Sequence, residues 1–546
     1  MSKEGIVNIA GHLPEMARQQ PDTTAIIFPR GNRRLSFKEL DALSDRIAHG
    51  LVRCGIDHGV RTVLMVPPSP EFFALTFALF KVGAVPVLID PGLGIKNLKQ
   101  CLAEAEPRAF IGIPKAHAAR LLLGWGKETV TTLITVGKRL FWKGTTLDAL
   151  IEQQQTRAPF AMARTEKEET AAILFTSGST GPPKGAVYSH GNFSAQVAAL
   201  RTVYGIQPGE IDLPTFPLFA LFAPAMGITA VIPEMDFTRP GSVNPRKILD
   251  TINRYNATTM FGSPALINRV SRFGAKHGTK LPTLRRVISA GAPVPASVLE
   301  RFTSLLNPGV EVFTPYGATE ALPVCSIGSK EILNETRAIT DAGGGVCVGR
   351  PVAGVQLEII AISDAPIACW DESLRVPTGK IGEIVVKGEQ VTRRYYNRPE
   401  ADLLAKIADP DNGGFFHRMG DLGGKDEQGR IWFCGRKSHR VTTSEATLFT
   451  IPCEAVFNTH PSVLRTALVG VGKPGQQLPV LCVELEKDGT KDRDKVRHEL
   501  LAIAAAHIHT QGIATILFHP AFPVDIRHNA KIFREKLAHW AAVKLA

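Results

Sequence analysis

The sequence Ile173-Leu174-Phe175-Thr176-Ser177-Gly178-Ser179-Thr180-Gly181-Pro182-Pro183-Lys184-Gly185 joins an apolar strand to a loop of glycine, serine and threonine that ends in a lysine. Such a loop suits a phosphate, because glycines let backbone N–H groups approach an anion, hydroxyls add donors and Lys184 adds a positive charge. Two prolines separate Gly181 from Lys184, and Gly185 stands where the common P-loop has serine or threonine. The stretch therefore predicts a phosphate site of a different kind, placed after a strand of an α/β protein.

A strand–helix–strand pattern precedes this loop. Residues 62–66 form a short apolar run, Phe72, Leu75 and Leu79 recur at helical spacing, and Val85–Ile89 is a second apolar run. Similar strand-length runs lie at 171–175, 258–261, 286–289 and 311–313, with helix-like segments between several of them. The fold class is therefore α/β, with a layered parallel sheet.

In the last third of the sequence, the pattern changes to strands joined by turns. A strand is predicted over 381–387, and the turn residues at 426–429 join two further strands, the second of which leads into Gly435. The chain of 546 residues exceeds what one hydrophobic core usually supports. We expect a large layered N-terminal domain of sheets and helices over 1–435. We expect a small, mobile α+β lid domain over 436–546.

The composition is typical of a globular enzyme, with 44% hydrophobic and 21% charged residues. A net charge of +12 and a pI near 9.3 favour anionic partners, for which nucleotide phosphates suffice. The sequence contains no Lys/Arg block interleaved with aromatics and no helix-turn-helix, zinc-finger or RNA-stacking motif. We therefore expect a small-molecule substrate and no nucleic acid partner.

Cysteine usage and hydropathy bear on the compartment. The cysteines show no close C-x-x-C pair, which predicts neither a disulfide framework nor a zinc site and favours a reducing compartment; they are Cys54, Cys101, Cys325, Cys347, Cys369, Cys434, Cys453 and Cys482. The N-terminal segment carries charges in place of an apolar core, so no signal peptide is expected. We expect a cytoplasmic protein.

One uncharged stretch, Leu213–Pro233, is about long enough to cross a bilayer. Three prolines and Gly227 interrupt any helix there, and Asp212 and Glu234 close the stretch at once. It predicts a buried helix or the wall of an acyl pocket, and the chain is not expected to be transmembrane.

Six further segments complete a pattern that runs through most of the chain. They are Gly83-Ala84-Val85-Pro86 with Asp90-Pro91, Ser289-Ala290-Gly291-Ala292-Pro293, Tyr316-Gly317-Ala318-Thr319-Glu320, Gly420-Asp421, Gly435-Arg436 and Asn529-Ala530-Lys531. In this order they resemble the adenylate-forming superfamily, which contains acyl-CoA synthetases, peptide-synthetase adenylation domains and luciferases. The resemblance implies an enzyme that uses ATP and Mg²⁺ to convert a carboxylate to an acyl-adenylate.

The resemblance also implies a role for each motif residue. The residues for adenine and ribose are Gly291, Ala292, Pro293, Tyr316, Gly317, Asp421 and Arg436. Those for the phosphates are Thr176, Ser177, Gly178, Ser179, Thr180, Gly181 and Lys184. Thr319 would donate to the α-phosphate, Glu320 would bind Mg²⁺, and Lys531 would be the catalytic lysine. Any one of them alone would more often be an ordinary core or surface residue, and their shared order favours the functional interpretation.

A mobile lysine suits this chemistry. A carboxylate that attacks the α-phosphate of ATP brings two anions together, so positive charge is needed where negative charge accumulates. Mg²⁺ and Lys531 would supply it. A lysine carried on a lid completes the site only when substrate is bound, and the closed lid excludes water from a hydrolysable anhydride.

Three departures from the acyl-CoA synthetase pattern concern the acceptor of the acyl group. Ser438 occupies the hinge position, which is typically Asp or Lys. The loop at 439–446 lacks the glycine that lines the pantetheine tunnel in those enzymes, and Ala220 replaces the histidine of their acyl gate. These departures leave adenylation intact and disfavour thioester formation.

With these departures, the chain resembles the olefin-biosynthesis β-lactone synthetases. This resemblance implies a long-chain 2-alkyl-3-hydroxy acid whose own hydroxyl attacks the activated carbonyl and displaces AMP. It also implies that the protein can assemble with other olefin-pathway enzymes. His190 and His439 both stay open as the base, and chain length, stereochemistry and oligomeric state are not predicted.

Two other functions compete with this interpretation. The first is a medium- or long-chain fatty acyl-CoA synthetase with a divergent hinge. The second is an inactive nucleotide-binding regulator, against which four intact residues argue: Lys184, Glu320, Asp421 and Lys531.

Overall fold

The computed structural model describes residues 7–154, 158–175, 182–486, 492–525 and 531–546. Its α-helices are α1 (His12–Gln19), α2 (Phe37–Arg53), α3 (Pro70–Lys81), α4 (Ile95–Ala105), α5 (Pro114–Leu123), α6 (Leu147–Glu152), α7 (His190–Tyr204), α8 (Pro217–Ala220), α9 (Phe222–Met226), α10 (Pro245–Tyr255), α11 (Pro264–Lys276), α12 (Ala296–Thr303), α13 (Ser329–Glu331), α14 (Arg337–Asp341), α15 (Pro399–Ala405), α16 (Thr450–Phe457), α17 (Arg493–Ala506) and α18 (Arg534–Leu545). No helix within these ranges has the length and hydropathy needed to cross a membrane.

Two large sheets build the N-terminal part. The first has the order β19 (Arg394–Tyr395), β9 (Gly185–Ser189), β8 (Thr170–Phe175), β4 (Val85–Ile89), β3 (Arg61–Met65), β5 (Ala109–Gly112), β6 (Thr132–Thr135) and β7 (Thr145–Thr146). From β8 to β7 every pairing is parallel, and β9 and β19 are antiparallel. The predicted strand–helix–strand unit is β3–α3–β4, and it lies in the parallel region.

The second sheet is larger and mixed. Its order is β17 (Gln356–Ile360), β18 (Gly382–Lys387), β21 (Phe415–Lys425), β22 (Ile431–Arg436), β16 (Val346–Pro351), β15 (Ala321–Gly328), β14 (Glu311–Ala318), β13 (Arg286–Ser289), β12 (Thr259–Gly262), β10 (Ile211–Pro214), β11 (Thr229–Val231), β1 (Thr24–Phe28) and β2 (Arg33–Ser36), and β20 (Lys406–Ala408) pairs with β21. The strands from β1 to β14 pair in parallel, and β14 to β18 pair antiparallel. The antiparallel half carries most of the predicted nucleotide residues.

Helix α3 shows where hydropathy alone misled. Spacing predicts one apolar face for this helix, yet nearly all of its side chains are buried, because α2 covers the side that faces away from the sheet. Even Lys81 is buried, and its Nζ lies 2.6 Å from Asp41 Oδ1 and 2.5 Å from Asp45 Oδ1 on α2. The ion pairs satisfy a charge that would otherwise be costly to bury.

The stretch Leu213–Pro233 is not one buried helix. It contains the end of β10, the short helices α8 and α9, and β11. Pro214 ends β10, Pro217 begins α8, and the chain turns after α9 at Gly227, whose φ is +72°. The alternative prediction of a pocket wall fits, since Phe216, Leu218 and Phe222 line a cavity.

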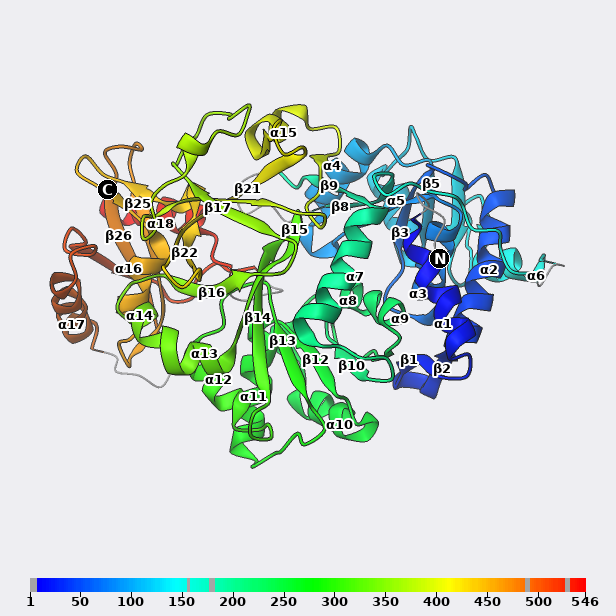
Figure 1. Ribbon diagram of the computed structural model, residues 1–546, viewed down its shortest axis with the longest axis horizontal. Coiled ribbons are helices and arrows are strands. Elements are labelled where there is room, and N and C mark those ends of the chain that lie inside the picture. Colours follow the sequence, from blue (N-terminus) through cyan, green and yellow to red (C-terminus); the bar gives the residue numbers. More distant parts are fainter. Residues whose placement is uncertain (1–6, 155–157, 176–181, 487–491, 526–530) are drawn as a thin grey trace.

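The C-terminal part forms a smaller unit with its own core. A three-stranded sheet of β25 (Val463–Val471), β26 (Leu478–Leu485) and β27 (Thr515–Phe518) packs against α16, α17 and α18, beside the hairpin of β23 (Val441–Thr442) and β24 (Thr447–Leu448). These elements lie at the left of Figure 1, at the opposite end of the molecule from α1, α2 and α3. The expectation of a large N-terminal domain and a small α+β C-terminal domain matches this arrangement.

The thiols agree with the absence of a disulfide framework. All eight cysteines are free, and six of them are buried. Within the described ranges, no three His, Cys, Asp or Glu side chains gather as a metal site.

Candidate active site

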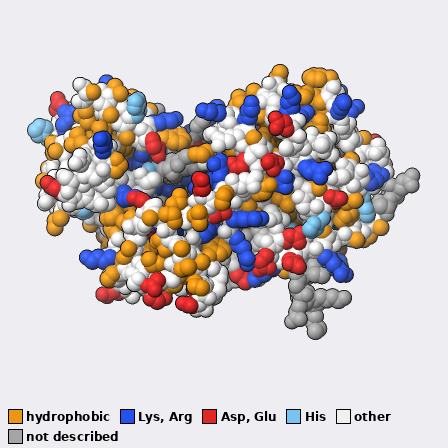
Figure 2. Space-filling model, turned by 90° about the horizontal axis from the view of Figure 1, so that it is seen from above, with side chains coloured by type: hydrophobic (Ala, Val, Ile, Leu, Met, Phe, Trp, Pro, Cys, Tyr) orange, Lys and Arg blue, Asp and Glu red, His pale blue; other side chains and the backbone are white. Residues whose placement is uncertain are grey.

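One cavity of about 2040 Å³ brings the predicted site residues together. Every predicted residue that the structure describes lines it: Lys184, Gly291, Ala292, Pro293, Tyr316, Gly317, Thr319, Glu320, Asp421, Arg436, Ser438 and Lys531. The residues Thr176, Ser177, Gly178, Ser179, Thr180 and Gly181 lie outside the described residues. Figure 2 shows the hollow between the C-terminal part on the left and the N-terminal part on the right, with charged side chains along its rim.

Tyr316, Asp421 and Arg436 form a hydrogen-bonded group on three strands. The Tyr316 hydroxyl on β14 donates to Asp421 Oδ2 over 2.7 Å, and Arg436 Nη1 on β22 donates to Asp421 Oδ1 over 2.7 Å. Asp421 and Arg436 are direct partners in the antiparallel register of β21 and β22. The pairing of β21 with β22 therefore fixes Asp421 beside Arg436, and the hydrogen bond to Asp421 joins Tyr316 to them.

Electrostatics reinforce this group. Asp421 is only 4% exposed, and its carboxylate raises the pKa of Arg436. Burial, together with the neighbouring carboxylate, raises the pKa of Tyr316 well above its usual range. Tyr316 therefore stays a neutral donor and Arg436 a permanent cation. Each Asp421 oxygen keeps a further lone-pair site, so the carboxylate can also accept two hydroxyl groups of a ribose.

Thr319 and Glu320 occupy the tight turn between β14 and β15. The Thr319 carbonyl accepts a hydrogen bond from the Tyr188 hydroxyl, and the Glu320 carbonyl accepts one from Thr392 N–H over 2.8 Å. A Cβ on the nearby Gly317 would lie 2.6 Å from the Ala321 carbonyl oxygen, so only glycine fits this turn. The backbone thus holds Thr319 and Glu320 at the cavity wall.

Sequence reasoning missed a residue that contacts Glu320. The Tyr395 hydroxyl on β19 donates to Glu320 Oε1 over 2.7 Å. Lys184 Nζ lies 5.0 Å from the centre of the Tyr395 ring, within the range of a cation–π contact. Tyr395 therefore links the lysine of the phosphate loop to the carboxylate predicted to bind metal. The only signal in the sequence is the aromatic pair Tyr395-Tyr396 ahead of Pro399.

A second group that the sequence did not indicate lies behind Glu320. Lys406 on β20 donates to the Thr392 carbonyl, and burial lowers the pKa of its ammonium to about 7, against the opposing pull of Glu320 and Asp402. Burial also lowers the pKa of His417 on β21 well below its usual range, with Lys406 as a further cause. Both side chains pack beneath the polar end of the cavity, and His417 lines it.

Gly291, Ala292 and Pro293 form the turn after β13. Gly291 has φ of +102°, which favours glycine, and the turn faces the cavity that Tyr316 also lines. The Tyr316 ring and this turn line the same cavity, so an adenine base can lie between them.

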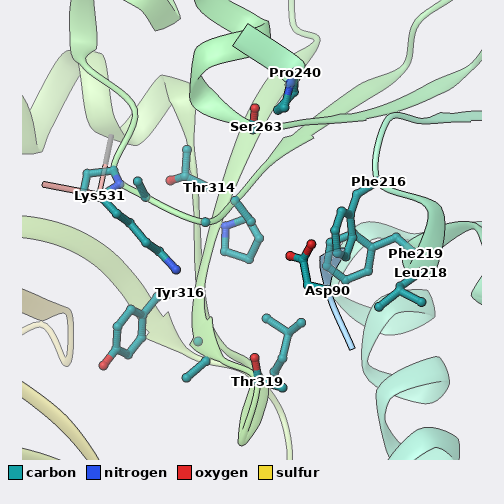
Figure 3. Close-up of a pocket in the computed structure, with 18 of the residues that line it drawn as sticks. Asp90, Phe216, Leu218, Phe219, Pro240, Ser263, Thr314, Tyr316, Thr319 and Lys531 are labelled. Carbon is teal, nitrogen blue, oxygen red and sulfur yellow. The ribbon is translucent and has the colours of Figure 1, made fainter. Parts of the chain in front are cut away.

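Lys531 reaches the cavity from the C-terminal part. It lies just before α18, next to the bridge between Val524 and Ile532, and its carbonyl accepts a hydrogen bond from Asp525 N–H over 2.9 Å. Figure 3 shows its side chain extending into the pocket towards Tyr316, on the side opposite to Phe216 and Phe219. The following turn is held by Arg534, whose Nη1 lies 2.6 Å from Glu454 Oε1 on α16.

The segment after Arg436 is compact. Ser438 lies in a short 3₁₀ turn between β22 and β23. The glycine-free loop then forms a closed hairpin, in which Thr443 N–H donates to the Ala446 carbonyl over 2.9 Å and the Thr443 hydroxyl accepts from Ala446 N–H over 2.9 Å. Because this loop contains no glycine, every residue of the turn carries a side chain.

The two histidines left open as bases differ in their surroundings. Nδ1 of His190 accepts a hydrogen bond from Ile9 N–H over 3.2 Å, and burial lowers its pKa to about 4. His439 lines the cavity, and its Nε2 lies 3.4 Å from Glu535 Oε1 on α18. His190 is committed to the packing of the chain near Ile9, whereas His439 faces the cavity.

An aromatic wall lines the cavity away from the polar group. Its rings contact one another in two groups. Phe193 lies 5.9 Å from Phe80 and 6.3 Å from Phe222 between ring centres, and Phe219 lies 4.4 Å from Phe261. Phe216 packs on Phe219 at 5.2 Å. Ala220 lies buried behind this wall, so no imidazole occupies its position. The wall suits a long apolar chain.

The residues present fit ATP with Mg²⁺. Mg²⁺ usually takes one or two carboxylates together with substrate phosphates and water, not a closed cage of protein ligands. Glu320 offers such a carboxylate beside Thr319, and the described part of the chain holds no cluster of metal ligands that would compete with it.

Comparison with known proteins agrees with this geometry. The AMP-binding enzyme family matches residues 13–396. The chain is 53% identical to an olefin beta-lactone synthetase of Stenotrophomonas maltophilia, over 98% of each chain. It is 25% identical to a long-chain-fatty-acid–CoA ligase of Mycobacterium tuberculosis, over 85% of this chain and 86% of that protein.

A solved structure shares the fold at lower identity. The amide bond synthetase McbA from Marinactinospora thermotolerans superposes with a TM-score of 0.81 at 22% identity, covering 98% of this chain and 99% of its own.

Proposed function

This chain belongs to the AMP-binding enzyme family, and we propose that it activates a long-chain 2-alkyl-3-hydroxy acid with ATP and closes it to a β-lactone with release of AMP. The chain is an adenylate-forming ligase. We propose the lactone product because the chain is 53% identical to an olefin beta-lactone synthetase along nearly its whole length. The structural observation that supports the proposal best is the single cavity, which joins a polar end at Asp421 and Glu320 to an aromatic wall at Phe219 and Phe222.

In the first step, a carboxylate oxygen of the substrate attacks the α-phosphorus of ATP and pyrophosphate leaves. Asp421 and Arg436 hold the ribose, Tyr316 faces adenine, and Thr319 donates to the α-phosphate. Lys531 places its ammonium where negative charge gathers, and Lys184 follows the departing pyrophosphate. When bound, Mg²⁺ at Glu320 supplies further positive charge to the phosphates.

In the second step, the substrate's 3-hydroxyl oxygen attacks its own activated carbonyl carbon. The bond from that carbon to the phosphate oxygen of AMP breaks, the hydroxyl proton passes to a base, and a four-membered ring remains. Because nucleophile and electrophile belong to one molecule, the reaction gains from proximity and needs no second substrate. Of the two histidines considered as the base, His439 is the one that lines the cavity, and it can take this proton.

The segment after the hinge favours an internal nucleophile over CoA. In the acyl-CoA synthetases that the chain resembles, a glycine-containing loop after the hinge lines the pantetheine tunnel, whereas here the corresponding loop has no glycine and forms a closed hairpin at 441–448. Fatty acyl-CoA ligases are also distant relatives, at 25% identity. The acyl-CoA synthetase alternative is therefore the weaker one.

We also propose that residues 436–546 act as a lid that turns at Ser438 and carries Lys531 over the nucleotide. The separate core of the C-terminal part supports this division. A cytoplasmic location and assembly with other olefin-pathway enzymes complete the proposal.

The test is product analysis by mass spectrometry. The purified protein, Mg-ATP and a long-chain 2-alkyl-3-hydroxy acid should yield β-lactone, AMP and pyrophosphate in equal amounts, with no change when CoA is added. A thioester that forms only with CoA would overturn the proposal in favour of an acyl-CoA synthetase. Failure to exchange pyrophosphate with any acid would indicate the inactive regulator.

A further inference from the structure

A surface at the end of α5 combines exposed apolar side chains with cations. Leu122 is 85% exposed and Phe141 is 82% exposed, and Leu121 and Leu140 are also exposed. Large apolar side chains scattered singly over a surface are common, but a group of four from two neighbouring segments indicates a binding surface. We call the group Leu121, Leu122, Leu140 and Phe141 the α5 patch.

Trp142 holds the two segments of the α5 patch together. Its buried ring stacks on His117 of α5 at 5.3 Å, and its Nε1 donates to Thr135 Oγ1 on β6 over 2.9 Å. Phe141 precedes Trp142 directly, and Leu121 lies one helical turn after His117 on the same face of α5. The exposed phenylalanine therefore stands on an anchored base beside the helix.

Cations surround the α5 patch. Lys138, Arg139 and Lys143 flank Leu140 and Phe141 in the loop, and all three are exposed. Lys127 follows α5 and is exposed as well. Between Pro114 and Leu147 the sequence contains one acid, Glu128. The surface thus pairs apolar tips with a positive field.

The α5 patch is continuous with the cavity. Lys115 and Ala119 line the cavity, and Leu122 follows them at helical spacing on the same face of α5. Trp125, in the turn after the helix, also lines the cavity. One helix therefore connects the cavity wall to the exposed apolar tips.

We propose that the α5 patch docks on the surface of a bilayer rich in anionic lipids. Cations beside exposed Phe and Leu are the combination that binds such a surface, because the apolar tips enter the headgroup boundary while lysines meet the lipid charge. A protein partner fits less well, since lysine is depleted in protein–protein interfaces. Docking there would place the cavity beside the phase in which a substrate with long alkyl chains dissolves, a benefit that rests on the proposed function.

The experiment is flotation of the full-length protein with vesicles, without ATP or hydroxy acid. The protein should bind vesicles of phosphatidylglycerol and phosphatidylcholine, bind pure phosphatidylcholine at least tenfold more weakly, and be released by high salt. The triple variant Lys138→Glu, Arg139→Glu, Lys143→Glu should bind on the order of 100-fold more weakly, since each cation near an anionic surface is worth about fivefold. Leu122→Asp with Phe141→Asp should lose about tenfold or more.

A matched control is Ile508→Asp, which removes a side chain that is 90% exposed on the C-terminal part and should leave vesicle binding unchanged. Circular dichroism melting checks that every variant is folded. As a second readout, Phe141→Trp should gain fluorescence quenching by brominated lipids.

Three results would overturn the proposal: no binding to anionic vesicles, binding that survives both patch variants, or patch variants that change the oligomeric mass without lipid. The last result would make the α5 patch a protein interface. Because none of these measurements uses the reaction, β-lactone formation can fail while docking stands, and the reverse.

Discussion

The polar end of the cavity contains two regions that are built in opposite ways. Tyr316, Asp421 and Arg436 come from three strands of one sheet and are joined by hydrogen bonds of 2.7 Å. Lys531 comes from the C-terminal part, is exposed, and lies directly before Ile532, which forms a β-bridge with Val524. The first region is assembled by the fold before any ligand binds. The second depends on where the C-terminal part lies.

This difference suggests a division of labour. Preassembled hydrogen bonds favour ligand binding, because the side chains are already ordered in the folded protein and lose little conformational entropy when the ligand binds. A cation delivered from another part of the chain serves the chemical step, because it can act after the nucleotide is in place. The predictions below probe this division, from the largest expected effect to the smallest.

Lys531→Ala should break the chemical step and leave binding intact. We expect the rate of pyrophosphate release to fall about 100- to 1,000-fold, since one preorganised charge on the transition state is removed. The Kd for ATP, measured by calorimetry, should change by less than about threefold. Lys544→Ala, an exposed lysine at the end of α18, is the matched control and should behave like the wild type. Equal losses in ATP affinity and rate would contradict the division.

Asp421→Asn should do the reverse. A neutral amide of the same size weakens the hydrogen bonds to Tyr316, Arg436 and ribose, so ATP affinity should fall about 10- to 100-fold. At saturating ATP the rate should fall much less. Tyr316→Phe keeps the carboxylate and removes one donor, and it should lose less affinity than Asp421→Asn. A rate defect that excess ATP cannot relieve would place Asp421 in the chemical step.

Tyr395→Phe tests the link between the phosphate lysine and the metal carboxylate. Removal of the hydroxyl frees Glu320 Oε1 from its 2.7 Å hydrogen bond, so the carboxylate loses its fixed orientation. We expect a rate loss of about 3- to 10-fold, together with a change in the Mg²⁺ concentration that gives half the maximal rate. The neighbouring Tyr396→Phe should alter neither. If Tyr395→Phe lowers thermal stability alone, its role is structural.

Lys406→Met should have the smallest effect on catalysis and appear in stability. Burial lowers the pKa of Lys406 to about 7 in the folded protein, from 10.5 for a solvent-exposed lysine. Between these two values the unfolded chain binds more protons, so stability rises with pH from about 7 towards 10. Below pH 7 both states carry the charge, and its full penalty applies. The Lys406→Met variant lacks this pH dependence. In urea titrations, its gain in the free energy of unfolding between pH 6 and 9 should be smaller than that of the wild type by roughly 1–3 kcal/mol.

Local pattern predicted the fold and much of the site. The parallel strands β3, β4 and β8 carry continuous apolar runs, and such runs arise because both faces of the sheet are covered. The motif at 316–320 was found through its resemblance to the adenylate-forming superfamily, and the structure places its Gly317 in a turn where only glycine fits. Membership of the adenylate-forming superfamily, predicted from the order of such motifs, is confirmed.

The features that could not be predicted from the sequence depend on contacts with residues far along the chain. Tyr395 stands 75 residues from Glu320, and an aromatic pair is an ordinary strand signal. Lys406 resembles any surface lysine until β20 and β21 pack around it. Helix α3 has the spacing of an amphipathic helix, but α2 covers its outer face, and ion pairs with α2 satisfy the buried Lys81. Burial and pairing, which follow from tertiary structure, decide these cases.

The central claim is that the carboxylate is adenylated and then attacked by the substrate's own hydroxyl. The most direct test uses a hydroxy acid labelled with ¹⁸O in both carboxylate oxygens. The claim predicts that one label leaves in AMP and one stays in the lactone carbonyl, because the ring oxygen comes from the hydroxyl. Unlabelled AMP with both labels in the lactone would show that the hydroxyl carbon was activated instead, and would contradict the claim.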